Sequence, residues 1–145
     1  MSYRIRPIAE KCVDELLGYT LRPPLATAEM KMVAAARRVA LRDLSADQLR
    51  ALITQGEGLT YLLPFALARL ERDPLLEASS LRGDLLSAVL QAEVFWIARP
   101  EPRERIRAVI AEALARLATV RIVDGEMEPR LQTALARIEQ VSAGR

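Results

Sequence analysis

The stretch that decides the fold, residues 44–96, reads LSADQLRALITQGEGLTYLLPFALARLERDPLLEASSLRGDLLSAVLQAEVFW. Ser45 begins a helix, and Gln48 three residues later completes a capping box. Gly56 ends this first helix, and a second one follows over residues 59–72. Because residues 59–72 are apolar on most sides, we expect this segment to be the central and most buried helix.

The second half of the stretch alternates chain breaks with helical segments. Pro64 lies one turn inside the second helix and predicts either a loose first turn or a kink. An Asp-Pro pair at 73–74 ends that helix, and a third helix follows a loop and covers residues 83–91. We assign structural roles to Pro64, to Gly83 and to Trp96, the only tryptophan.

The flanking sequence has the pattern of ordinary amphipathic helices. Upstream, residues 10–17 predict a short helix, and Thr27 caps a longer one over residues 28–41. Downstream, apolar residues recur at helical spacing over residues 104–119 and again over 126–141. The whole chain therefore predicts a series of helices joined by short breaks.

The composition agrees with an all-α fold. The chain has 145 residues, 51% hydrophobic and 28% charged, and strong helix formers such as Ala, Leu, Arg and Glu dominate. We expect a compact all-α bundle of about six to seven helices in a single domain over residues 1–145. The single cysteine, the lack of a secretory signal and the lack of a bilayer-spanning apolar run predict a cytoplasmic protein without a membrane partner.

The charges are unevenly distributed although the net charge is only +2. Residues 1–42 carry eight basic and four acidic groups, residues 43–98 carry four and eight, and residues 99–145 carry nine and seven. The acidic middle segment is consistent with a solvated helix surface or with a surface for a partner, and both interpretations stay open.

Few residues have the chemistry that catalysis needs. The chain has no histidine, which removes the commonest general base and metal ligand. Cys12 follows a lysine, but a lone cysteine on a short helix is more typical of a core residue. The sequence also lacks a glycine-rich phosphate loop and paired metal-binding carboxylates. We therefore predict a protein without enzymatic activity, cofactor or metal.

A DNA-binding or regulatory helical protein is the alternative. Two helices joined around residues 56–58 resemble a helix-turn-helix in outline. A recognition helix needs polar and basic side chains at its start, whereas residues 59–65 read LTYLLPF. The basic residues Arg37, Arg38 and Arg42 are interpreted as a solvated face.

Five carboxylates in the acidic segment are candidates for contact with a basic partner. Glu71, Asp73, Glu77 and Asp84 surround the loop that follows the second helix, and Glu57 lies in the earlier turn. Glu71 and Asp73 also fit a helix end, and we expect Asp84 to cap the next helix. Glu77 has no such role and is the better contact candidate.

The residues with the most specific order and spacing are Leu44, Asp47, Leu49, Arg50, Leu52, Ile53, Gln55, Gly58, Leu59, Leu62, Pro64, Ala66, Leu67, Leu70, Pro74, Leu75, Gly83, Asp84, Leu85, Leu86, Val89, Leu90 and Trp96. In this pattern the chain resembles the immunity proteins of bacterial contact-dependent growth inhibition (CDI) systems. The resemblance covers a little over a third of the chain.

This resemblance implies an all-helical, non-enzymatic protein that binds the C-terminal toxin domain delivered by a neighbouring cell. It implies that the toxin, typically a nuclease, is blocked in the cytoplasm, and that the partner is this protein domain and not nucleic acid. Two features depart from the family. Residues 78–81 read Ala-Ser-Ser-Leu where members often carry an acidic residue and aromatics, and the net charge of +2 differs from the acidic balance expected of an inhibitor of a basic nuclease.

Overall fold

The computed structural model describes residues 6–119 and 125–144. All the secondary-structure elements in these two ranges are helices. The all-α prediction is therefore confirmed, and six of the α-helices have seven or more residues. The elements are the 3₁₀ helices η1 (Ile8–Glu10) and η2 (Leu41–Asp43), and the α-helices α1 (Val13–Leu17), α2 (Ala28–Ala36), α3 (Ala46–Gln55), α4 (Leu59–Arg72), α5 (Asp84–Gln91), α6 (Glu93–Trp96), α7 (Pro100–Leu117) and α8 (Met127–Ala143).

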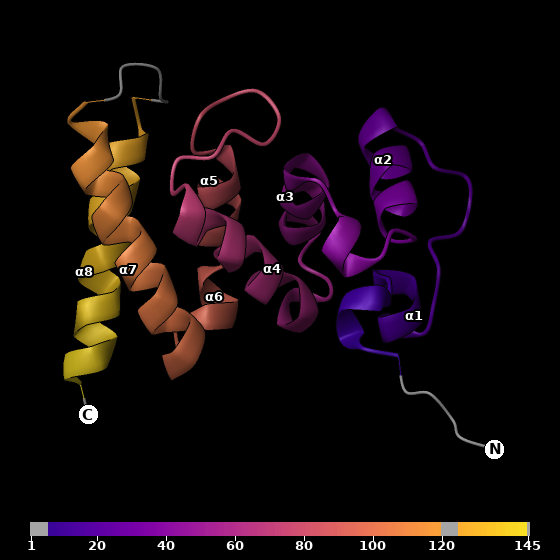
Figure 1. The fold of residues 1–145 in the computed structure, drawn as a ribbon, viewed down its shortest axis with the longest axis horizontal. Helices are drawn as coiled ribbons and strands as arrows, with labels where there is room; N and C mark the ends of the chain where they lie inside the picture. Colours follow the sequence, from indigo (N-terminus) through magenta and orange to yellow (C-terminus); the bar gives the residue numbers. More distant parts are fainter. Residues whose placement is uncertain (1–5, 120–124, 145) are drawn as a thin grey trace.

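The helices follow one another along the long axis of the molecule (Figure 1). α7 and α8 lie side by side at one end, α1 and α2 lie at the other, and α3, α4, α5 and α6 lie between them. α4 packs against α3, α5 and α7 and buries five apolar side chains, namely Leu62, Leu63, Ala66, Leu67 and Leu70. The prediction of a central, buried helix over residues 59–72 is thus confirmed.

Both ends of α3 are formed by the residues that the sequence indicates. The Ser45 side chain accepts a hydrogen bond from the Gln48 backbone N–H at 3.1 Å, and the Gln48 side chain accepts one from the Ser45 backbone N–H at 2.9 Å. Gly56 ends α3 at φ +80°, in the left-handed region that favours glycine. The predicted capping box and glycine stop are both confirmed.

Two helix boundaries differ from the prediction by four residues or more. α2 ends at Ala36 instead of residue 41, because the backbone groups that would continue it bind the α1 region. The Arg37 carbonyl oxygen accepts a hydrogen bond from the Asp14 N–H at 3.0 Å, and the Leu41 N–H donates to the Lys11 carbonyl oxygen at 2.9 Å. α7 begins at Pro100, four residues before the predicted start. Both prolines at its beginning, Pro100 and Pro102, fall in the first turn, where a backbone N–H has no partner within the helix.

One hydrophobic cluster extends from Val13 in α1 to Ile138 in α8. Trp96 is fully buried, and its Nε1–H donates a hydrogen bond to the Val89 carbonyl oxygen at 2.8 Å. Pro64 lies on the exposed side of a continuous α4, so the apolar side of that helix still faces the core. Among the described residues, no helix has both the length and the apolar character needed to cross a bilayer.

Candidate binding site

Arg37 lies in the interior, which corrects the prediction that it belongs to a solvated face. Its side chain is 3% exposed, whereas Arg38 and Arg42 are exposed as expected. The Arg37 Nε donates to Asp14 Oδ1 at 2.6 Å and Nη1 donates to Glu57 Oε2 at 2.8 Å. These pairs connect the end of α2 to α1 and to the turn between α3 and α4.

Glu57, the first candidate contact residue, is part of this network. The Tyr19 hydroxyl and the Arg37 guanidinium both donate hydrogen bonds to its carboxylate, and together they lower the pKa of Glu57 below its ordinary value. The side chain nevertheless keeps 48% exposure. Glu57 is therefore an oriented, ionised carboxylate at the surface.

Glu71 and Asp73 connect the end of α4 to α7. Arg105 donates two hydrogen bonds to the Glu71 carboxylate, at 2.7 and 3.1 Å, and they lower the pKa of Glu71. Asp73 ends α4, accepts from the Leu75 backbone N–H at 3.3 Å, and lies 3.7 Å from Arg116. The expected role at a helix end thus holds for Asp73, and both carboxylates have arginine partners.

Asp84 does not cap α5, which corrects the prediction made from sequence. Gly83 occupies the cap position at φ +88°, and Asp84 is the first helical residue. Its carboxylate turns back to the preceding loop and accepts hydrogen bonds from three backbone N–H groups, those of Ala78, Ser79 and Ser80, at 2.6, 2.8 and 3.1 Å. Burial raises the pKa of Asp84, but these backbone hydrogen bonds outweigh it and lower the pKa overall.

Glu77 lies in the same loop and has a different environment. Its side chain is exposed, and it forms no hydrogen bond or ion pair within residues 6–119 and 125–144. The structure therefore does not gather the five candidates into one cluster. It distributes them over the turn between α3 and α4, the end of α4 and the loop before α5.

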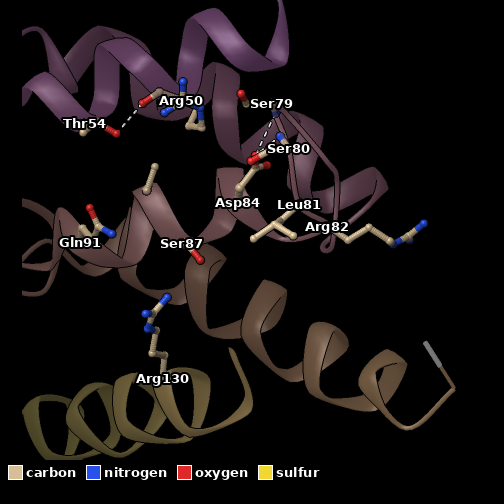
Figure 2. A pocket seen from close by; sticks show the side chains of 11 residues that line it. Arg50, Thr54, Ser79, Ser80, Leu81, Arg82, Asp84, Ser87, Gln91 and Arg130 are labelled. Atoms are coloured by element: carbon tan, nitrogen blue, oxygen red, sulfur yellow. Dashed lines mark hydrogen bonds between the residues drawn. The ribbon is translucent and has the colours of Figure 1, made fainter. Parts of the chain in front are cut away.

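A hollow that sequence reasoning missed lies beside this loop, between α3, α5 and α8 (Figure 2). Its volume is about 390 Å³, and its walls carry three arginines, one carboxylate and several hydroxyl groups. The lining residues are Arg50, Thr54, Ser79, Ser80, Leu81, Arg82, Asp84, Ser87, Ala88, Gln91 and Arg130. They come from four separate segments, so no local pattern in the sequence indicates this site.

A second hollow of about 390 Å³ continues the first along α8. The two share Ser87, Gln91 and Arg130, and the second extends to Glu93 and Arg137. Arg137 and Glu93 form an ion pair at 3.0 Å across this part. We call the two hollows together the α5–α8 groove.

The possible metal ligands, the single cysteine and the start of α4 bear on the other classes of function. Within the described ranges, no three or more cysteine and carboxylate side chains gather closely enough to hold a metal ion. Cys12 is buried, as expected for a core residue. At the start of α4, Leu62 and Leu63 face the core and the exposed positions are Thr60 and Pro64, so this turn lacks the basic side chains with which a recognition helix contacts bases. The surface features, namely the groove and the exposed carboxylates, are suited to binding.

Comparison with known families decides the classification. The sequence pattern of one family, described as CDI immunity proteins, matches residues 20–106, which is more than half of the chain. This chain belongs to the CDI immunity protein family. The matched region of this immunity protein runs from the segment before α2 into α7 and includes Glu57, Glu71, Asp73, Glu77 and Asp84. Neither the comparison with curated proteins nor that with solved structures finds a match.

Proposed function

We propose that this CDI immunity protein binds the C-terminal toxin domain of its cognate CDI effector, a nuclease, and blocks it in the cytoplasm. The family match over residues 20–106 is the observation that carries this proposal. The inhibitor acts by forming a stoichiometric complex and without turnover. The rigid helical scaffold supports this mode, because a surface that is already ordered loses little conformational entropy when it binds.

Glu77 is the first of the proposed toxin contacts. It is exposed and unpaired among the described residues, so a basic group of the toxin can bind it without breaking an internal ion pair. Glu57, Glu71 and Asp73 are 48%, 43% and 39% exposed and are held by arginines, so each offers an oriented carboxylate to the toxin. Asp84 acts by holding the backbone of the loop that carries Glu77.

The test is a titration with the immunity protein of the toxin domain whose gene lies next to its own. Purified toxin domain is assayed for DNA and RNA cleavage while the immunity protein is added in increasing amounts. We expect a stable complex, complete inhibition at one equivalent, and survival of cells that express both proteins. Absence of a complex together with absence of rescue would reject the proposal. Inhibition far below one equivalent would instead indicate an enzymatic mechanism.

Charge reversal tests the contact residues. Glu77→Lys is expected to weaken toxin binding by about tenfold, since it replaces attraction with repulsion at the interface. Glu139→Lys is the matched control, because Glu139 is exposed on α8 and has no ion pair in the part of the chain that the structure describes. Equal affinities of the two variants would remove Glu77 from the interface and leave toxin binding itself intact.

A further inference from the structure

The α5–α8 groove is basic although it lies largely on the acidic middle segment of the chain. Its walls carry four arginines, Arg50, Arg82, Arg130 and Arg137, and two carboxylates, Asp84 and Glu93. The Asp84 carboxylate is already bound by three backbone N–H groups, and Glu93 is bound by Arg137. The groove therefore attracts anions and offers no free carboxylate to a cation.

The arginines come from separate elements and line one groove. Figure 2 shows Arg50 on α3 and Arg130 on α8 on opposite sides of α5, with the Arg130 guanidinium directed toward the hollow. Asp47 holds Arg50 at 2.8 Å, so this guanidinium is fixed in place. Arg82 extends outward at the rim, and its guanidinium makes no ion pair with any described residue.

The shape of the groove favours a segment of polypeptide over a compact ligand. Its two hollows are continuous through Ser87, Gln91 and Arg130, and along α8 the groove reaches from Arg130 to Arg137. Seven residues of helix span about 10 Å, which is the length of roughly three residues of extended chain. The hydroxyls of Ser79 and Ser80 add neutral hydrogen-bond donors beside the charges.

We propose that the α5–α8 groove binds an acidic segment of the toxin domain, with Arg82 and Arg130 pairing with its aspartate or glutamate side chains. Arginine binds carboxylates through two parallel hydrogen bonds and is common among residues that dominate interface affinity. This inference rests on the proposed function. It adds a second contact of opposite charge to the one at Glu77, which lies in the same loop but lines neither hollow.

A zero-length cross-link identifies the partner group directly. Carbodiimide joins a lysine amine to a carboxylate that it touches, and this chain contains only two lysines, Lys11 and Lys31. The variant Arg82→Lys keeps the charge and introduces one amine at the rim of the groove. We expect it to cross-link to an aspartate or glutamate of catalytically inactive toxin domain, located by mass spectrometry. Arg38→Lys, exposed two residues beyond the end of α2, is the matched control and is expected to give no cross-link.

Affinity measurements complete the test. Arg82→Glu and Arg130→Glu are each expected to weaken toxin binding tenfold or more, whereas Arg38→Glu stays within twofold of the wild type. Circular dichroism establishes that each variant is folded before its affinity is measured. Raising the salt concentration is expected to weaken the wild-type complex more than the Arg82→Glu complex.

Each outcome has a distinct meaning. Normal toxin binding by both groove variants, with no cross-link at position 82, would overturn the groove assignment and leave the proposed function standing. Loss of binding by the wild type itself would reject the proposed function and the groove assignment together. Retention of a single-stranded oligonucleotide by the wild type and not by Arg82→Glu would identify nucleic acid as the occupant and overturn the assignment.

Discussion

At the scale of single residues, the charged side chain that contributes most to the fold is the buried, ion-paired Arg37. Arg37 is almost fully buried and binds Asp14, which is itself only 9% exposed, together with Glu57 and the Tyr19 carbonyl oxygen. Burial lowers the pKa of Arg37, but hydrogen bonds to these carboxylates outweigh it and raise the pKa, so the guanidinium stays charged. Such a network fixes how α1, α2 and the turn before α4 meet.

Removing the buried guanidinium tests this role. Arg37→Met preserves much of the side-chain volume but leaves Asp14 buried without a counter-charge. We expect a loss of about 3 kcal/mol in the free energy of unfolding, measured by urea denaturation, at the lower end of the range for breaking a buried ion pair. Arg38→Met, at the exposed neighbouring position, is expected to change stability by less than about 0.5 kcal/mol. Equal effects of the two substitutions would contradict the structural role of Arg37.

Asp84 makes the stability of the loop dependent on pH. Its pKa is lower in the folded chain than the ordinary 3.8, so its ionised form stabilises the fold above that value, and this stabilisation disappears as the pH falls through the lower, folded-state pKa. Asp84→Asn removes the titration, and we expect it to cost about 1 kcal/mol at pH 6. The difference in melting temperature between wild type and variant should shrink as the pH falls from 5 to 3. A difference in melting temperature that stays constant between pH 5 and pH 3 would contradict the assignment of this pH dependence to Asp84.

The candidate site could be predicted from sequence only in its residue types. The sequence identifies Glu57, Glu71, Asp73, Glu77 and Asp84 as carboxylates near turns, yet their partners come from distant positions. Arg105, for example, is 34 residues from Glu71. Ion pairs of this kind depend on how helices pack, which single-sequence patterns do not encode. The groove arginines escaped detection for the same reason, since four segments contribute to one surface.

At the scale of elements, helix ends with local causes were predictable and the others were not. The Ser45 capping box and the glycine at 56 act within a few residues, and the structure places both as the sequence indicates. The end of α2 depends on backbone hydrogen bonds of Arg37 with Asp14 and of Leu41 with Lys11, which are 23 and 30 positions apart in the chain. Apolar spacing alone therefore extended that helix five residues too far.

Gly83 determines how the loop enters α5 and how closely α8 approaches. It has φ +88°, and an added Cβ would lie 2.6 Å from the Met127 Cε. We expect Gly83→Ala to reduce stability by about 1–2 kcal/mol in thermal or urea unfolding, because the left-handed backbone is strained for alanine and the Met127 side chain must move. Gly125→Ala is the matched control, since a Cβ there meets no atom within 4 Å. If Gly83→Ala left the free energy of unfolding unchanged, this would show that the loop before α5 adjusts without cost.

At the scale of the whole molecule, one apolar cluster connects helices that otherwise contact few neighbours. α2 packs mainly on α3 and α8 mainly on α7, while the cluster runs through α3, α4, α5 and α7 between them. Charge is divided over the molecule: the exposed carboxylates Glu57 and Glu77 precede and follow α4, and arginines line the α5–α8 groove. A partner that contacted both the carboxylates and the groove would itself need both signs of charge, and such a requirement increases selectivity.

A continuous core also predicts that the two ends of the molecule unfold together. Trp96 is the only tryptophan and lies fully buried in α6, whereas Arg37 lies at the α1–α2 end (Figure 1). If the chain is one cooperative domain, Arg37→Met lowers the urea midpoint of Trp96 fluorescence and of far-UV circular dichroism equally, by about 1.5 M for a slope of about 2 kcal/mol per M. The contrary outcome is a midpoint that shifts in circular dichroism while the midpoint of Trp96 fluorescence stays at the wild-type value. The effect of losing the Arg37 network would then be confined to one end of the molecule. Such a result would show that α1 and α2 unfold separately from the remaining helices.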